Sequence, residues 1–468
     1  MLDFFTSLDD IVWGAPLLIL LVGTGVYLTV RLGLLQIIKL PKAFKLIFTD
    51  DKGQGDISSF AALATALAAT IGTGNIVGVA TAIKAGGPGA LFWMWVAAFF
   101  GMATKYSEGF LAVRYRTIDE EGHVLGGPFY YIENGMGHKW KWLAKIFAFF
   151  GACVGLFGIG TFTQVNGIAS AVQSFFDPNK EDTVSILGND YSIAIVITAF
   201  VLAICVGLVV IGGIKRIANV SQVIVPFMAV LYIVAVLVLI VTNITKLPGA
   251  IVTIVEYAFG AKAVAGGVFA SIAISMQKGI ARGIFSNEAG LGSAPIAAAA
   301  AKTKDPVRQG LVTMTGTFID TIIVCTLTGL SIVMMGAYKV VGLDGVQVTT
   351  YAFQKGLSFL PAEVSAFILM VCLVFFAFTT ILGWDYYGER CLEYLSNKSK
   401  TAVKVYRWLY ILAVFIGPYM TVKAVWTIAD IFNGLMAIPN IIALFVLSGI
   451  VAKETKDYFD EKKKQNNK

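Results

Sequence analysis

The segment that decides the fold reads TALAATIGTGNIVGVATAI and runs from Thr65 to Ile83. It is apolar enough to lie in a membrane, yet its centre, TIGTGN at residues 70–75, disfavours a continuous helix. Each of its two glycines costs about 1 kcal/mol relative to alanine inside a helix, and threonine and asparagine side chains can bond to nearby backbone groups instead. Because interrupted backbone persists at membrane depth only against protein or a cavity, the segment predicts a discontinuous helix that lines a polar pocket.

The half-helix ends would give this pocket a definite chemistry. Their free N–H groups bind anions and their free carbonyls bind cations, so the pocket suits a substrate carboxylate and a metal ion. An alternative is that Gly74 and Gly78 form a small-residue face against which another helix packs. The additional glycine at position 72 and the flanking polar residues favour the interruption.

The composition is that of a polytopic membrane protein. Of the 468 residues, 57% are hydrophobic and 14% are charged, whereas soluble domains average about 25% charged residues. The net charge of +7 comes largely from lysine and arginine in short connections and tails, so it indicates membrane topology and not a nucleic-acid partner. The five cysteines are scattered, with neither a disulfide framework nor a metal-binding spacing.

Hydropathy and basic residues divide the chain into eleven predicted spans. They lie at about 11–30, 56–85, 90–116, 142–176, 191–212, 217–243, 260–302, 309–338, 361–394, 402–419 and 425–451. Lysines and arginines cluster at every second exit, which predicts an outside N-terminus and a cytoplasmic C-terminus. The segment LLQIIKLPKAFKLIF after the first span has the pattern of an interfacial amphipathic helix.

The last ten spans divide into two sets of five. Each set begins with a glycine-rich span that carries polar residues, around Gly72 and around Gly279, which predicts a second interruption. Matched interruptions in two inverted halves indicate the binding site of a transporter. The predicted fold is therefore an all-α polytopic membrane protein of eleven transmembrane helices, divided as follows: an extra helix with the interfacial helix at 1–55, a first five-helix repeat at 56–243, an inverted repeat at 244–451, and a cytoplasmic tail at 452–468.

Two long motifs resemble those of the alanine or glycine:cation symporter family. They are ALAATIGTGNIVGVATAIKAGGPGALFWMWVAAFFGMATKYSEGFLAVRYR and KGIARGIFSNEAGLGSAPIAAAAA, and the similarity extends over essentially the whole chain. The resemblance implies a LeuT-type 5+5 inverted-repeat fold in the cell membrane. It also implies sodium-driven uptake of alanine or glycine without catalysis, so sodium is expected as a co-transported ion and a small neutral amino acid as the substrate.

The resemblance also implies site residues. Backbone N–H groups near Gly72 to Gly74 are expected to hold the substrate carboxylate, and carbonyls around Ala273 to Met276 the substrate ammonium. The substrate residues expected are Thr70, Gly72, Thr73, Gly74, Asn75, Gln164, Ala273, Ser275, Met276 and Gly279. The sodium ligands expected are carbonyls of Ala68, Ile71 and Phe376 and hydroxyls of Thr379 and Thr380.

Other polar residues in the spans leave alternatives open. Gln164 either touches the substrate or only bridges helices, and Asn166 lies roughly 200° further round the helix, so the two should not share one pocket. Asp320 is either a proton carrier or an acid paired within the bundle. Four charged residues are expected to form ion pairs on the cytoplasmic side of the pocket, which either act as an inner gate or only neutralise each other: Lys278, Arg282, Glu288 and Asp385.

These observations rank the possible functions. Sodium-coupled symport comes first, and a proton-coupled amino-acid permease that uses Asp320 is the near alternative. An intramembrane enzyme is remote, because neither an HExxH zinc motif nor a GxSxG nucleophile motif occurs. A channel usually builds its filter from repeated subunit loops, whereas the inverted placement here favours alternating access. The expected partners are the amino acid and the lipid bilayer, and the sequence indicates no protein partner.

Overall fold

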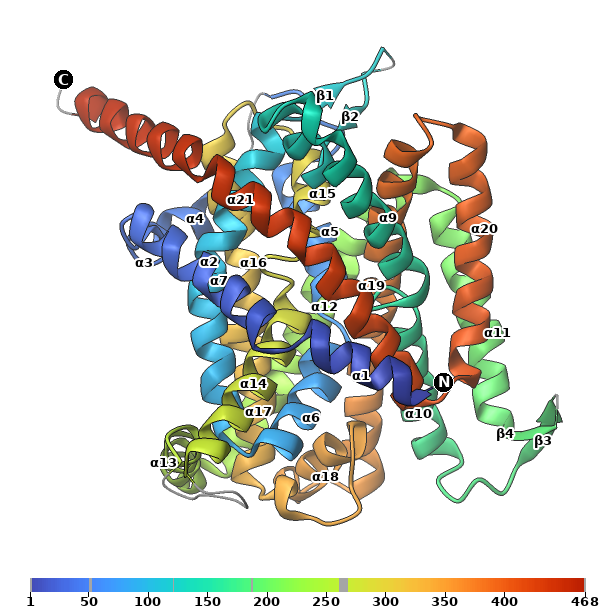
Figure 1. The fold of residues 1–468 in the computed structure, drawn as a ribbon. Coiled ribbons are helices and arrows are strands. Elements are labelled where there is room, and N and C mark those ends of the chain that lie inside the picture. The colour runs from blue at the N-terminus through green and yellow to red at the C-terminus, as the bar shows by residue number, and fades with distance from the viewer. Residues whose placement is uncertain (1, 50–52, 121, 187, 261–267, 467–468) are drawn as a thin grey trace.

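The computed structural model describes residues 2–49, 53–120, 122–186, 188–260 and 268–466 (Figure 1). The chain is mostly helical (80%). Two short antiparallel hairpins complete it, β1 (Thr117–Ile118) with β2 (Val124–Leu125), and β3 (Thr183–Ile186) with β4 (Asn189–Ser192). The two hairpins mark opposite ends of the helical bundle (Figure 1). We name them the β1–β2 end and, after helix α18 (Val346–Gly356), which lies at the same end as β3–β4, the α18 end.

The N-terminal part consists of four helices before the first interrupted segment. They are α1 (Leu2–Val12), α2 (Ala15–Arg31), α3 (Leu35–Ile38) and α4 (Leu40–Ile47). Positive φ angles at Gly33 (63°) and Leu34 (57°) turn the chain sharply between α2 and α3. The segment predicted as one interfacial helix is therefore two short helices.

The two predicted repeats contain the remaining helices. The first comprises α5 (Ser59–Thr70), η1 (Gly74–Gly78), α6 (Val79–Gly86), α7 (Gly89–Arg114), α8 (Pro128–Tyr130), η2 (Tyr131–Gly135), η3 (His138–Trp140), α9 (Lys141–Phe157), α10 (Phe162–Phe176), α11 (Ile193–Val210) and α12 (Gly213–Thr242). The second comprises η4 (Ile244–Lys246), α13 (Leu247–Ala258), α14 (Val268–Asn287), α15 (Ala294–Ala299), α16 (Pro306–Thr317), η5 (Phe318–Cys325), α17 (Thr326–Met334), η6 (Ala337–Lys339), α18 (Val346–Gly356), α19 (Ala362–Leu395), α20 (Lys400–Ile416), η7 (Gly417–Tyr419) and α21 (Val422–Asn466).

The second interruption is not where the sequence predicted it. Helix α14 is continuous through Gly279 and ends only at Asn287. Gly279 serves a helix contact, because a Cβ atom there would lie 2.3 Å from the carbonyl oxygen of Ala90 in α7. The backbone breaks instead over residues 288–293, where Glu288, Gly290 and Gly292 have φ angles of 58°, 90° and 83°.

Two predicted segments have more internal detail than the sequence indicated. The residues predicted as one span at 142–176 form one candidate membrane span, within which residues 158–161 separate α9 from α10. The residues predicted as a tail at 452–468 continue α21 as a helix to Asn466.

The membrane character of the chain is confirmed. In the described ranges, six helices are long and apolar enough to cross a membrane, and a seventh span results if α5 is counted together with η1 and α6. Helix α2 is apolar but shorter. The count of eleven spans therefore stays a prediction.

The two interrupted segments lie antiparallel in the bundle. Ile57, just before α5, forms a β-bridge with Ala301, just after α15. The first segment therefore starts at the β1–β2 end, where the second one finishes. This arrangement brings both interruptions into the buried middle of the molecule.

Candidate functional site

The first interruption lies between α5 and η1. Helix α5 ends at Thr70, Ile71 is extended (φ −78°, ψ 96°), and the two helical parts meet at a bend of 51°. No side chain fits at Gly72, because a Cβ atom there would lie 2.5 Å from the Thr380 hydroxyl oxygen and 2.8 Å from Oε1 of Gln164. The predicted break at this position is therefore confirmed.

Side-chain amides satisfy the backbone N–H groups that this break frees. The N–H of Gly72 donates to Oδ1 of Asn75 (2.9 Å), and the N–H of Thr73 donates to Oε1 of Gln164 in α10 (3.0 Å). Nε2 of Gln164 donates in turn to the carbonyl of Ile159 (2.9 Å). All of these side chains except Ile159 are at least 99% buried, so neutral amide oxygens occupy the first break.

The helix-packing alternative holds for only one of the two glycines. A Cβ atom at Gly74 would lie 3.2 Å from the Cα of Ser286 in α14, whereas the nearest atom to a Cβ at Gly78 is 4.0 Å away. Gly74 therefore allows the first interruption to approach the last turn of α14. Thr70 contributes less to the break, since its hydroxyl donates back to the carbonyl of Ala66 in its own helix (3.1 Å).

Oxygen atoms converge beside the first break, where the sodium ligands were expected. The hydroxyl oxygen of Thr380 in α19 lies 3.1 Å from the carbonyl oxygen of Ile71 and 3.0 Å from that of Phe376. The hydroxyl oxygen of Thr379 also lies 3.0 Å from the Phe376 carbonyl. Each hydroxyl has only one hydrogen to donate, so Thr380 can donate to only one of the Ile71 and Phe376 carbonyls at a time.

Close contact between α19 and α5 maintains this oxygen cluster. A Cβ atom at Gly383, one turn after Thr379, would lie 2.8 Å from the backbone nitrogen of Ala69. Ala68, the fifth expected sodium ligand, is fully buried in the same turn of α5 as Ala69. The structure therefore brings Ile71, Phe376 and the two threonines together, with Ala68 one turn before Ile71.

Asp320 connects the two interrupted segments. It lies in the π-helical segment η5 and is fully buried. Its carboxylate accepts hydrogen bonds from Nδ2 of Asn75 (2.7 Å), Oγ of Ser286 (2.9 Å) and Oγ1 of Thr321 (2.7 Å). π-Helical turns are frequent at functional sites, and both η1 and η5 contribute residues here. Asp320 is thus paired within the bundle, by neutral donors.

The second interruption, residues 288–293, is held by a carboxylate. Oε1 of Glu108 in α7 accepts hydrogen bonds from the backbone N–H groups of Gly290 and Gly292 (3.2 Å each) and from Nδ2 of Asn440 in α21 (2.7 Å). Asn440 also donates to the carbonyl of Gly290 (2.9 Å). Glu108 and Asn440 are fully buried, so a carboxyl group of the protein itself occupies the second break.

Four residues expected at the substrate site lie away from both breaks, in the middle of α14. They are Ala273, Ser275, Met276 and Gly279. Ala273 and Met276 are exposed and line an apolar groove between α14 and α2. Ser275 and Gly279 are buried against other helices. Because carbonyls inside a helix bond to N–H groups of the next turn, the prediction that carbonyls of 273–276 are free was wrong.

The charged residues expected as an inner gate pair differently. No two of these four form an ion pair with each other in the part of the chain that the structure describes. Arg282 instead makes a bidentate ion pair with Asp430 of α21 (Nη1–Oδ1 3.0 Å, Nη2–Oδ2 2.6 Å), and its guanidinium lies over the ring of Trp426. Glu288 accepts a hydrogen bond from Nε1 of Trp384 (2.9 Å). The prediction of an inner-gate network was therefore wrong.

A cavity of about 300 Å³ reaches the first break from the α18 end. The residues that line it include Thr73 and Val77 of the first interrupted segment, Asn166 of α10, Asp344 before α18, and Trp426 of α21. Asn166 faces this cavity, whereas Gln164 bonds to the break itself. The expectation that the two amides face different surroundings is confirmed.

At the β1–β2 end, the side chain of Arg116 connects the two interrupted segments. The guanidinium of Arg116 donates hydrogen bonds of 2.5–2.8 Å to four backbone carbonyls, those of Gln54, Ala299, Ala301 and Thr303. The N–H of Asp56 donates to the carbonyl of Ala300 (2.9 Å). These bonds join the start of the first interrupted segment to the finish of the second.

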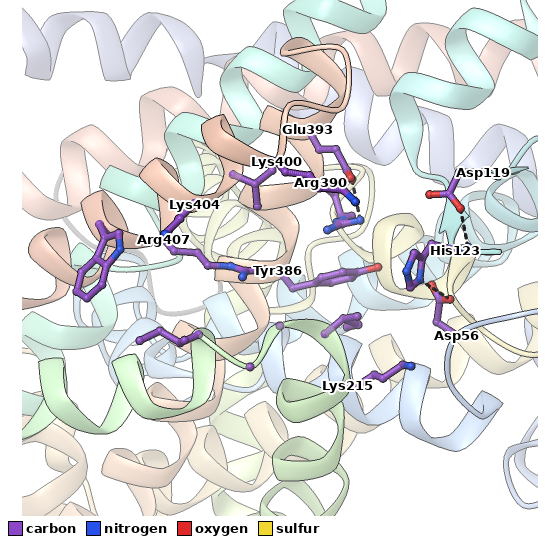
Figure 2. A pocket seen from close by; sticks show the side chains of 16 residues that line it. Asp56, Asp119, His123, Lys215, Tyr386, Arg390, Glu393, Lys400, Lys404 and Arg407 are labelled. Atoms are coloured by element: carbon purple, nitrogen blue, oxygen red, sulfur yellow. Dashed lines mark hydrogen bonds and ion pairs between the residues drawn. The ribbon is translucent and has the colours of Figure 1, made fainter. Parts of the chain in front are cut away.

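A second cavity, of about 650 Å³, opens at the same end (Figure 2). Its acidic and basic side chains are partly paired, with His123 beside Asp56 (3.7 Å) and Arg390 beside Glu393 (2.7 Å). None of its lining residues belongs to either interruption. Access to the first break is therefore from the α18 end in this conformation.

Three residues that hold the site together were not predicted from the sequence: Glu108, Asn440 and Arg116. A signal for the second break was present in NEAGLGS at 287–293, where two glycines follow an acid. The partners of that loop come from α7 and α21, which are far away in sequence, so no local pattern identifies them. Arg116 looked like an ordinary basic residue at the end of a span.

Interrupted helices whose free backbone groups face a buried polar site define a secondary transporter. The chain belongs to the sodium:alanine symporter family, whose model matches residues 1–468. This confirms the family inferred from the sequence, and the protein is a transporter and not an enzyme.

Individual relatives agree with this assignment. The chain is 56% identical to an uncharacterized transporter of Haemophilus influenzae (98% of this chain, 97% of the relative). It is 49% identical to the sodium/alanine symporter AgcS of Methanococcus maripaludis (98% and 97%) and 38% identical to the amino-acid carrier protein AlsT of Bacillus subtilis (99% and 94%). Its fold resembles the crystal structure of MhsT in complex with L-phenylalanine, a LeuT-fold transporter (TM-score 0.58, 14% identity, 86% and 93% covered).

Proposed function

We propose that the protein is a sodium-coupled symporter of small neutral amino acids of the alanine and glycine type. The observation that carries this proposal is the convergence of the Ile71 and Phe376 carbonyls with the Thr380 hydroxyl at a helix break. Carbonyls of unwound backbone coordinate sodium in transporters of this architecture. The carbonyl of Ala68 and the hydroxyl of Thr379 would complete the ligand set.

The substrate carboxylate would bind at the N–H groups of Gly72, Thr73 and Gly74. The first two now donate to neutral amide oxygens of Asn75 and Gln164. Hydrogen bonds to an ionised acceptor are roughly twice as strong as those between neutral groups, so a carboxylate can displace the Gln164 oxygen. Gln164 is then a substrate-contacting residue that also fills the empty site. Thr70 would only support this turn.

The substrate ammonium would bind at the last turn of α14. The final carbonyls of a helix have no partner within the helix, and the Cα of Ser286 in this turn lies close to Gly74. The last turn of α14 thus replaces residues 273–276 as the proposed ammonium site. Ion and substrate bind together, because each offsets the charge of the other in a buried pocket.

Transport would follow alternating access. The cavity at the α18 end admits sodium and amino acid to the first break, and release at the opposite end requires the Arg116 bonds to part. The basic residues at the β1–β2 end favour a cytoplasmic location for it. The N-terminus would then lie outside and the C-terminus in the cytoplasm, with eleven spans.

Uptake by proteoliposomes tests the proposal. Purified protein should accumulate radiolabelled alanine when an inward sodium gradient is imposed, and replacing external sodium with potassium should abolish uptake. Alanine affinity, measured in detergent, should rise with sodium concentration. An affinity that is independent of sodium would refute the coupling.

Proton coupling through Asp320 is the second candidate. The acid is fully buried and contacts residues of both interrupted segments. If it carries the coupling proton, Asp320→Asn abolishes uptake driven by a pH gradient. Sodium-driven uptake that survives in Asp320→Asn would rule this candidate out.

A further inference from the structure

A basic cleft lies at the β1–β2 end, away from both interruptions. It has a volume of about 520 Å³ between the α2–α3 turn and the C-terminal part of α21. Four cationic side chains line it, those of Arg31, Lys39, Lys453 and Lys456. Its lining contains no acid among the described residues, so the side chains that line this cleft carry a net positive charge.

The neighbouring acids do not neutralise these cations. None of the four forms an ion pair among the residues that the structure describes, whereas Glu454 between them pairs with Arg114 (3.1 Å) on another side of α21. Lys39 and Lys42 lie over the ring of Phe459 (4.4 and 4.8 Å). Burial and the nearby ammonium groups of Lys462 and Lys39 lower the pKa of Lys42, against an opposing effect of Asp305.

Apolar side chains adjoin the charges. The cleft also contains Leu32, Leu35, Ile38 and Phe459. Beside it, Val30 is 75% exposed, Ile37 54% and Ile38 62%, which places the cleft where an apolar surface meets a cationic one. Phospholipids combine an anionic phosphate with apolar chains in the same way, and basic pockets between membrane helices bind such headgroups.

From this combination we infer that the cleft between α2–α3 and α21 binds the headgroup phosphate of an anionic phospholipid. Arg31 and Lys39 contact the phosphate from one wall, and Lys453 and Lys456 from the other. The acyl chains lie along the exposed apolar residues of α2 and α3. The bound lipid thereby links the N-terminal helices to the C-terminal helix on the membrane surface.

The test uses the full-length protein in a neutral detergent. Native mass spectrometry and thermal unfolding are measured with added phosphatidylglycerol or phosphatidylcholine at equal concentrations. The wild type should retain phosphatidylglycerol and unfold at a higher temperature with it, and phosphatidylcholine should have little effect. In the double variant Lys453→Gln/Lys456→Gln the apparent affinity for phosphatidylglycerol should fall about 25-fold, since each basic residue contributes about fivefold.

The matched control is Lys463→Gln/Lys464→Gln, which removes the same charge from the same helix outside the cleft. This variant should keep the wild-type response. Lys39→Gln on the opposite wall should weaken binding, and Lys39→Arg should restore it, which separates loss of the site from loss of folding. Equal retention of both lipids by the wild type, an equal loss in the control, or the same stabilisation by millimolar inorganic phosphate would overturn the inference.

Discussion

The two interruptions satisfy their free backbone groups in different ways. At the first, neutral amides of Asn75 and Gln164 accept the N–H hydrogen bonds. At the second, the carboxylate of Glu108 accepts them from Gly290 and Gly292. An amide oxygen can give way to a charged ligand, whereas a buried carboxylate already provides the stronger acceptor.

This difference assigns different roles to two breaks that look alike in sequence. Under the proposed function, the first break would exchange its internal acceptors for a substrate carboxylate. At the second break Glu108 already occupies the corresponding place, so we expect this break to act as a fixed joint between α14 and α15. Substitutions at the first break should therefore change transport, and substitutions at the second should change stability.

The largest effect is expected for Glu108→Ala. The change leaves the N–H groups of Gly290 and Gly292 and the amide of Asn440 buried without their acceptor. Each unsatisfied group costs about 1–3 kcal/mol, so the protein should unfold at a markedly lower temperature or fail to accumulate. Thermal unfolding in detergent measures this. Gln164→Ala is the counterpart at the first break. It leaves one buried N–H group, that of Thr73, without its acceptor, so it should lower the unfolding temperature by less than Glu108→Ala does, while transport is lost. Equal destabilisation in both variants would contradict the distinction.

Gly72→Ala should give the next largest effect, confined to transport. The new Cβ atom would lie 2.5 Å from the Thr380 hydroxyl oxygen and 2.8 Å from Oε1 of Gln164, so it would displace groups of both proposed sites. Since contacts under 3.0 Å must be relieved by movement, we expect alanine uptake to fall on the order of 100-fold, about 2.7 kcal/mol. Gly78→Ala, six residues further along the same interrupted segment, is the control, because the nearest neighbour of its Cβ atom would be 4.0 Å away. Uptake reduced equally in both variants would contradict a specific role for Gly72.

Removal of one proposed sodium ligand should have a smaller effect. Thr380→Ala deletes the hydroxyl that lies between the carbonyls of Ile71 and Phe376. Loss of one hydrogen-bonding oxygen costs about 1.4 kcal/mol, so the sodium concentration for half-maximal uptake should rise about tenfold. Thr380→Ser keeps the hydroxyl and should resemble the wild type. A sodium dependence that is unchanged in Thr380→Ala would place the ion elsewhere.

The two breaks also show which features of the fold could be predicted from the sequence. Residues 70–75 combine glycines with threonine and asparagine inside an apolar span, so local chemistry alone located the first break. In the second segment the sequence pointed to Gly279, which is a glycine required by close packing against Ala90. Whether a glycine breaks a helix or only admits a neighbour depends on tertiary contacts, and local sequence does not contain them.

For the same reason, the partners of the buried charged residues could not be predicted from the sequence. Arg282 and Glu288 lie six residues apart and seemed to belong to one network. Arg282 pairs instead with Asp430, and Glu288 with the indole of Trp384. Partners of buried charges come from helices distant in the chain, whereas the family motifs identified the fold and the class of function correctly.

The smallest effect is expected for a substitution at the contact that joins the two interrupted segments. Arg116→Gln removes most of the hydrogen bonds to Gln54, Ala299, Ala301 and Thr303. Because one hydrogen bond contributes about 1 kcal/mol net and more than one is lost, the open population of this end should rise by at least about fivefold. Amide hydrogen exchange at Asp56 and Lys302, whose N–H groups bridge the segments, should accelerate by that factor. Arg114→Gln is the control, since among the described residues the guanidinium of Arg114 pairs with Glu454 and lies over the ring of Tyr115, and neither residue belongs to an interrupted segment. If exchange at residues 56 and 302 is unchanged in Arg116→Gln, the arginine does not hold this end closed, and the backbone hydrogen bonds of residues 56 and 57 with residues 300–302 must do so.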